Sequence, residues 1–160
     1  MLLYHGSNLE VREPRILVAN RALDFGAGFY TTSSEAQAAR WAELQTLRRH
    51  RGVPTVTVYE FDETKAGVLS TLRFNEADGE WLDFVAQNRK SEYRGQRFDM
   101  VIGPVANDNT MPVINDYMAG SIGKETAIVL LKPQKLTDQY AFLTATALEV
   151  LTCKEVRTHD

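Results

Sequence analysis

The chain is poor in the residues that cross-link small proteins. Its one cysteine, Cys153, excludes an intrachain disulfide and is typical of a reducing, cytoplasmic setting, and its apolar neighbours predict a buried structural thiol. The three histidines, His5, His50 and His159, have no metal-ligand spacing, so we expect no metal site. A chain of 160 residues can bury roughly two thirds of its unfolded surface, so one domain over residues 1–160 needs no such cross-link.

Long apolar runs and a strong excess of charge are also missing. No apolar stretch approaches the ~18 residues that cross a bilayer, and the first residues lack a signal-peptide pattern, so we expect no membrane association. The net charge of −3 argues against a generally basic surface that coats nucleic acid. One local cluster, Arg89, Lys90, Arg94 and Arg97, indicates either a solvated helix end or a weak patch for an anionic partner.

Short strands and helices follow one another without a regular rhythm. Strands are expected at residues 2–5, 29–32, 55–61, 99–106, 140–143 and 151–157, and helices at 35–51, 79–91, 112–118 and 145–151. Residues 124–132 fit a helix or a strand, and Ile16-Leu17-Val18 fits a short strand or turn. Because no βαβαβ alternation appears, the pattern predicts an α+β fold rather than a doubly wound parallel sheet.

Two segments near the start each carry one polar ring beside glycines. They are Leu3-Tyr4-His5-Gly6-Ser7 and Phe25-Gly26-Ala27-Gly28-Phe29-Tyr30-Thr31-Thr32. A neutral imidazole offers one donor and one acceptor, glycine lets a ligand approach the backbone, and a tyrosine ring can stack on a heteroaromatic ring. Together they predict a clamp for a flat amide such as nicotinamide; the alternatives are a satisfied core histidine and an ordinary strand tyrosine. The second segment lacks the third glycine of a dinucleotide-binding fingerprint, which excludes a Rossmann site.

The first segment resembles the first signature of the diphtheria-toxin-like ADP-ribosyltransferases, the branch that includes the poly(ADP-ribose) polymerases. In that family an apolar strand ends in His-Gly-Thr/Ser. The second segment resembles the family's Phe-Gly-x-Gly-Ile-Tyr-Phe-Ala, in the same chain order. The whole chain also resembles a little-described group of small bacterial proteins, the DUF3990-like group, usually assigned to this superfamily. The resemblance implies a split antiparallel β-sheet core flanked by helices.

The resemblance also implies a set of residues that bind NAD⁺ as substrate. The backbone of Gly6 would hold the nicotinamide amide, and the rings of Tyr30 and Trp41 would stack on its two faces. His5 would bind the adenosine ribose, and Ser7 a nearby hydroxyl. His5 and Tyr30 are therefore expected to be catalytic, together with a third residue further along the chain.

That third residue is a glutamate before a late strand in the better-known members. The best match is Asp138-Gln139-Tyr140-Ala141-Phe142, which has Gln139 in place of the glutamate. A glutamine amide keeps a hydrogen bond to ribose but supplies no negative charge. Glu149 and Glu155 do not precede a strand in the right register. Asp99 and Asp108 are further sources of a carboxylate, although the residues around Asp108 also fit an Asx turn.

The function implied is an NAD⁺-dependent mono-ADP-ribosyltransferase that modifies an unidentified protein or nucleic acid, and a bacterial toxin restrained by an antitoxin-type partner fits this description. Three alternatives stay open. The change to Gln139 suggests a catalytically silent module that binds NAD⁺ or ADP-ribose. The others are an NAD⁺ glycohydrolase and a structural domain without a ligand.

Overall fold

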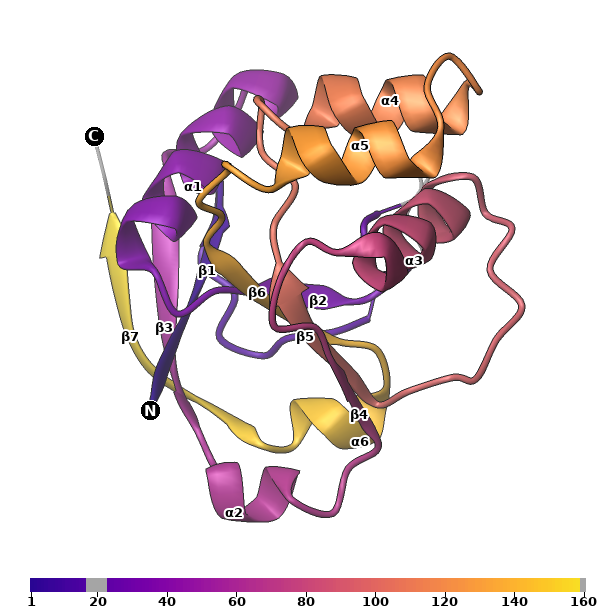
Figure 1. Cartoon of the computed structure of the whole chain (residues 1–160). Coiled ribbons are helices and arrows are strands. Elements are labelled where there is room, and N and C mark those ends of the chain that lie inside the picture. Colours follow the sequence, from indigo (N-terminus) through magenta and orange to yellow (C-terminus); the bar gives the residue numbers. More distant parts are fainter. Residues whose placement is uncertain (17–22, 159–160) are drawn as a thin grey trace.

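The computed structural model describes residues 1–16 and 23–158, which form two β-sheets flanked by helices (Figure 1). The first sheet has the order β1-β3-β7 and is antiparallel; its strands are Leu2–Ser7, Thr55–Phe61 and Leu151–Thr158. The second has the order β2-β6-β5-β4, formed by Phe29–Thr31, Asp138–Phe142, Met100–Pro104 and Thr71–Arg73. The predicted α+β class is confirmed.

One pairing corrects the expectation of a wholly antiparallel core. Strand β4 runs parallel to β5, with Thr71 opposite Met100. Parallel neighbours need a long crossover, which helix α3 (Gly79–Arg89) supplies. The sequence does not predict β4, because its three residues are exposed or half-buried and show no apolar alternation. Nor does it predict the one-turn helix α2 (Glu63–Ala66).

Helix α1 (Glu35–Arg49) forms where the sequence predicts it. The Ser34 hydroxyl caps its start by accepting a hydrogen bond from the backbone N–H of Gln37. The helix ends earlier than expected, because His50 already adopts the left-handed conformation, with a φ of 53°. Ala38 and Ala42, one turn apart, are fully buried on the face that packs on β1 and β3.

The later helices are α4 (Met111–Met118), α5 (Lys124–Leu131) and α6 (Ala145–Leu148). Helix α5 settles the ambiguity over residues 124–132: Ala127 and Leu131 are four residues apart and both buried, as a helix requires. Strand β6 begins at Asp138, so Gln139 lies inside a strand and not in the turn expected before it. The expected strand or turn at residues 16–18 falls largely outside the described residues.

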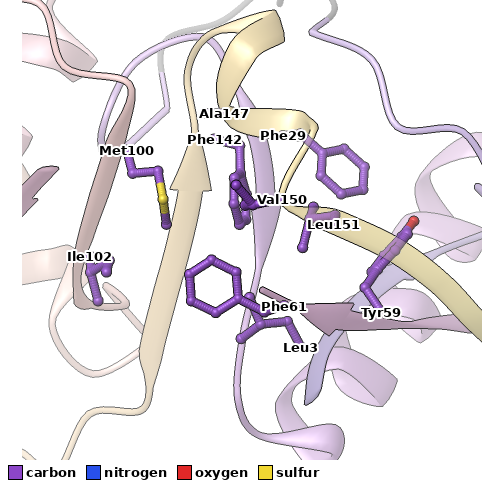
Figure 2. Packing of buried hydrophobic residues seen from close by; sticks show 10 residues of the cluster. All are labelled: Leu3, Phe29, Tyr59, Phe61, Met100, Ile102, Phe142, Ala147, Val150 and Leu151. Atoms are coloured by element: carbon purple, nitrogen blue, oxygen red, sulfur yellow. The ribbon is translucent and has the colours of Figure 1, made fainter. Parts of the chain in front are cut away.

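Two large apolar clusters and one small one hold the sheets and helices together. The first fills the space between the sheets and includes Leu3, Phe29, Tyr59, Phe61 and Phe142 (Figure 2). The second packs the opposite face of the β2-β6-β5-β4 sheet against α3, α4 and α5, through Phe25, Trp81, Val101, Ile114 and Ala141. Successive residues of a strand face opposite sides of its sheet, so β2 and β6 contribute alternately to both clusters.

Cys153 contacts the edge of the first cluster from β7 and is a free, partly buried thiol, less enclosed than expected.

Candidate functional site

The edges of β1 and β2 face each other and are joined by a single backbone pair. Tyr4 N–H donates to Thr32 O at 2.8 Å, and Thr32 N–H donates to Tyr4 O at 2.9 Å. No second pair follows this bridge within the described residues. The next contact uses a side chain: the His5 ring nitrogen Nδ1 lies 2.7 Å from the carbonyl oxygen of Tyr30. The structure therefore places the His5 ring against the Tyr30 backbone carbonyl at this junction.

Gly6 has a buried backbone whose polar groups face the junction. In a strand, alternate residues direct N–H and C=O to the same side. The Tyr4 groups bond Thr32, away from β3, so those of Gly6 also point away from β3 toward β2. Within residues 1–16 and 23–158, neither group has a hydrogen-bond partner. Buried backbone groups are almost always paired, so this donor and acceptor are available to a ligand.

The reason for a glycine at this position differs from the one expected. A Cβ on Gly6 would lie 1.9 Å from the carbonyl oxygen of Ala38 and 2.8 Å from the backbone nitrogen of Ala42. The glycine is required because α1 crosses β1 at very short distance. The direction of its backbone N–H and C=O, away from β3, results from strand geometry and not from the missing side chain.

The hydrogen bond to Tyr30 fixes the proton of His5. A carbonyl oxygen only accepts, so Nδ1 must carry the hydrogen. Burial lowers the pKa of His5 to about 4; the Tyr30 hydrogen bond opposes this shift and the nearby Arg49 charge adds to it. The ring is therefore neutral at pH 7, and Nε2 is an acceptor. The imidazole also stacks on Phe29, with centroids 4.3 Å apart, which holds its plane.

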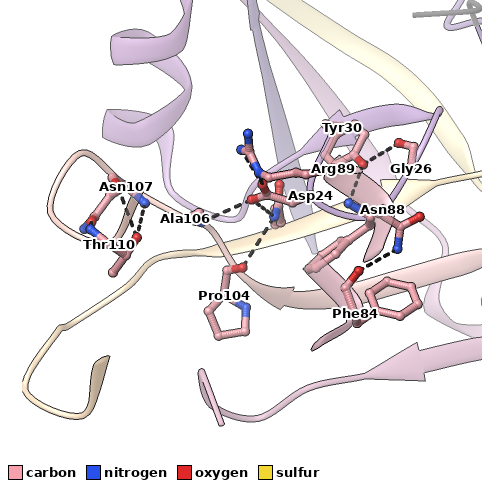
Figure 3. A network of polar contacts seen from close by, with 12 residues as sticks. Asp24, Gly26, Tyr30, Phe84, Asn88, Arg89, Pro104, Ala106, Asn107 and Thr110 are labelled. Atoms are coloured by element: carbon pink, nitrogen blue, oxygen red, sulfur yellow. Dashed lines mark hydrogen bonds and ion pairs between the residues drawn. The ribbon is translucent and has the colours of Figure 1, made fainter. Parts of the chain in front are cut away.

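Tyr30 holds the glycine turn that precedes it. Its hydroxyl donates to the carbonyl oxygen of Gly26 at 2.6 Å and accepts from the N–H of Phe25 at 2.9 Å (Figure 3). Gly26 has a φ of 91°, a conformation that other residues rarely adopt. Burial raises the pKa of Tyr30, so the hydroxyl keeps its proton. Because the Tyr30 hydroxyl is used to hold the loop, the flat face of the ring is the part of the side chain that suits stacking.

Gln139 belongs to a buried polar network and is 3% exposed. Its Nε2 donates to Asp24 Oδ2 at 3.0 Å and to the carbonyl oxygen of Pro104 at 3.4 Å. Asp24 is also bound by Arg89 and by the backbone N–H of Ala106 (Figure 3). This network links the loop before β2 to α3, β5 and β6.

Gln139 and Tyr30 project from the same face of their sheet. Tyr30 pairs with Ala141, and Ala141 and Gln139 are alternate residues of one strand. His5 stacks on Phe29, which faces the other side. Within the described residues no contact joins the His5 and Gln139 side chains directly; strand β2 lies between them.

Trp41 is half-buried on α1 and makes no aromatic pair with Tyr30 within the described residues. Its neighbours on the helix surface show which way it faces. Gln37 accepts from the Thr137 hydroxyl at 3.0 Å, and Arg40 pairs with Asp108 at 2.9 Å. Residues four apart share a helix face, so Trp41 lies on the side of α1 that approaches the loops around β5 and β6.

Ser7 is buried beneath the end of β1. Its hydroxyl donates to the side-chain oxygen of Asn8 at 3.3 Å. It occupies the same face of β1 as His5, two residues along the strand.

The two aspartates considered as sources of a carboxylate have structural contacts. Asp99 accepts from the backbone N–H and hydroxyl of Ser70 and from the hydroxyl of Thr144, which lowers its pKa. It precedes β5 at the end opposite Gly103, the residue that pairs with Gln139. Asp108 is exposed, in a loop that Asn107 closes as an Asx turn. This confirms the turn expected there.

The sequence does not identify Asp24 and Arg89 as members of one network. Asp24 is separated by 65 residues from Arg89 and by 115 from Gln139. Arg89 is not a solvated helix end, because it pairs with the buried Asp24 at 2.5 Å. The position of Asp24, two residues before Gly26, is the only feature of the sequence that points to a role for this acid.

Other features of the surface lie away from these residues. One pocket of about 300 Å³ is lined by Asp78, Pro104, Ile128 and their neighbours, and another of about 400 Å³ by Pro14, Ile16, Leu148 and theirs. Neither includes His5, Tyr30 or Gln139. In the part of the chain that the structure describes, no three His, Cys, Asp or Glu residues gather as a metal group. No helix there is both long and apolar enough to span a bilayer.

Comparison with known proteins gives one match. No curated protein and no solved structure matches the chain. The model of a family described as "Protein of unknown function (DUF3990)" matches residues 1–153, nearly the whole chain. The chain therefore belongs to the DUF3990 family.

Proposed function

We propose that this protein is an NAD⁺-dependent mono-ADP-ribosyltransferase with an ADP-ribosyltransferase-like arrangement of its two sheets. The observation that carries the proposal is the pair of Gly6 backbone groups, which have no partner among residues 1–16 and 23–158 and are buried beside a neutral His5. A carboxamide offers a carbonyl acceptor and an N–H donor side by side. The Gly6 N–H and C=O complement both, which supports nicotinamide as the group bound there.

The other residues have roles that fit the rest of NAD⁺. The His5 Nε2 acceptor suits a ribose hydroxyl, and Ser7 lies on the same face for a second one. The ring faces of Tyr30 and Trp41 are the proposed stacking surfaces. Gln139 would accept a hydrogen bond from the nicotinamide ribose.

The chemistry requires orientation more than proton transfer. Nicotinamide leaves as a neutral molecule with the electron pair of its bond to C1′, so no general acid is needed. The transition state at C1′ resembles an oxocarbenium ion, as in glycoside hydrolysis. A nucleophilic oxygen or nitrogen of the acceptor attacks C1′ and releases its proton to solvent. The protein contributes by fixing the ribose and excluding water.

The test combines binding with transfer. NAD⁺ at millimolar concentration should raise the melting temperature, and NAD⁺ labelled on its adenylate should label a macromolecule in a cell lysate. Both signals should be lost in His5→Ala and kept in His50→Ala, because His50 is an exposed helix-end residue. Tyr30→Phe is the second variant, since it keeps the ring and removes only the anchoring hydroxyl.

The same experiment separates the alternatives. Binding without transfer or nicotinamide release would identify a silent NAD⁺-binding module, which the glutamine at position 139 favours. Nicotinamide release without a labelled acceptor would identify an NAD⁺ glycohydrolase. If NAD⁺ causes no thermal shift, both the transferase and the module are wrong. The cytoplasmic location and an antitoxin-type partner stay predictions.

A further inference from the structure

The orientation of the Gln139 side chain is determined by its neighbours. Asp24 Oδ2 also accepts from the Ala106 N–H, and Pro104 O is a carbonyl oxygen, so both are acceptors and the group that faces them must be the Gln139 NH₂. The Oε1 atom therefore points the other way. Within the described residues no donor reaches it, although the side chain is 3% exposed. A buried amide oxygen without a donor indicates a place for a ligand hydroxyl.

Asp24 cannot serve a ligand itself. Its Oδ1 accepts from Arg89 Nε at 2.7 Å and Nη2 at 2.5 Å, and its Oδ2 accepts from the Ala106 N–H at 3.2 Å and from Gln139. Four donors occupy the carboxylate, which is 7% exposed. The Arg89 charge also neutralises it, so Asp24 does not replace the negative charge of a glutamate at position 139.

We propose that Asp24 is a positioning residue that holds the Gln139 amide with its oxygen toward the ligand, where it accepts a hydrogen bond from a ribose hydroxyl of NAD⁺. This inference rests on the proposed function for the identity of the ligand. Its structural part, the fixed amide, stands on the contacts of Gln139 with Asp24 and Pro104 and needs no ligand.

The variant that tests it is Asp24→Asn. The new amide keeps the shape of the side chain but has one donor group, which must face either the Arg89 guanidinium or the donors of Ala106 and Gln139. The Arg89 guanidinium has only donors and makes two contacts at this side chain, so it holds the new amide oxygen; the NH₂ then faces Gln139, and the Gln139 amide turns over and presents NH₂ to the ligand. We expect the rate of nicotinamide release at saturating NAD⁺ to fall about tenfold, with KM changed less than about threefold.

A double variant distinguishes orientation from general damage. Gln139→Glu alone places a carboxylate against Asp24, whereas Asp24→Asn with Gln139→Glu reverses donor and acceptor across the same contact. We expect the double variant to be more active and to melt higher than Gln139→Glu alone. This comparison remains valid if Asp24→Asn alone does not fold. Asp83→Asn is the matched control, because Asp83 pairs with Lys124 of α5 and accepts from the Tyr117 hydroxyl of α4, without contact to Asp24 or Gln139 among the described residues, and its substitution should leave the activity unchanged.

Side-chain amide NMR gives a readout that needs no NAD⁺. The Gln139 NH₂ protons should exchange with water at least about tenfold more slowly than those of the exposed Gln96, and Asp24→Asn should remove this protection. Equal exchange at the two glutamines overturns the proposal. So does a wild-type rate of nicotinamide release in a folded Asp24→Asn variant. Protection of Gln139 in a protein that neither binds nor cleaves NAD⁺ would refute the proposed function and the ribose contact, while the orienting role of Asp24 holds.

Discussion

The half-buried His5 makes stability depend on pH in a predictable direction. Its folded pKa is about 4, against an ordinary value of 6.5, because burial disfavours the imidazolium. Between these two values the unfolded chain binds a proton that the folded chain does not. The free energy of unfolding must therefore fall as the pH drops from 6.5 toward 4.

The size of this effect follows from the two pKa values. At pH 7.5 both states are almost fully neutral at His5, so the contribution is close to zero. At pH 5.0 the unfolded histidine is mostly protonated and the folded one is not. This difference lowers the free energy of unfolding by about 2 kcal/mol between the two pH values.

The comparison variant is His5→Asn, whose side-chain N–H can take the place of Nδ1–H and donate to the Tyr30 carbonyl. Urea unfolding of both proteins at pH 7.5 and 5.0 measures the change, and subtraction removes the contribution of the carboxylates. The wild type should lose about 2 kcal/mol more than the variant on acidification. Equal losses in the two proteins would mean that His5 is not buried in the neutral form.

Two further predictions concern residues that hold the junction and the network. Gly6→Ala should lower the free energy of unfolding by about 3 kcal/mol, because its Cβ would overlap the Ala38 carbonyl oxygen of α1. Chemical denaturation measures this loss. An unchanged denaturation midpoint would contradict the close approach of α1 to β1. Arg89→Ala should lower the free energy of unfolding by about 3 kcal/mol or more, because it leaves the Asp24 carboxylate buried without its cation. Arg40→Ala breaks an exposed pair and should lower it by less than about 1 kcal/mol. Similar losses of stability in the two variants, measured by thermal unfolding, would contradict the difference in burial between the two pairs.

Elements with strong local signals were predictable from the sequence. The strict alternation of residues 55–61 defines β3, and Ser34 with its cap defines the start of α1. The glycine-flanked His5 and Tyr30 segments each have the pattern of a short strand, and the sequence predicts that they form parts of one site. Their 2.7 Å contact is the part of the candidate site that the sequence indicates best.

Features that depend on residues far apart in the chain could not be predicted from the sequence, because no local pattern contains them. The parallel pairing of β4 with β5 depends on a crossover and not on any pattern within three residues. The partners of Asp24 come from two separate elements, and a lone acid near a turn is usually a solvated residue. Only the folded chain shows that this acid is buried, paired with Arg89 and bound to Gln139.

The network changes how the glutamine at position 139 is understood. The resemblance to the ADP-ribosyltransferases implies only that an amide stands where that family has a glutamate. In the fold, a carboxylate at this position would face Asp24 Oδ2 and the Pro104 carbonyl oxygen, at the 3.0 and 3.4 Å now spanned by donors. Two carboxylates so close cannot both be ionised, so one pKa would rise strongly. With Asp24 buried and saturated by donors, an amide is the side chain that completes the contact. The amide at position 139 is therefore coupled to the acid at position 24, and the pair must be varied together to learn what either contributes.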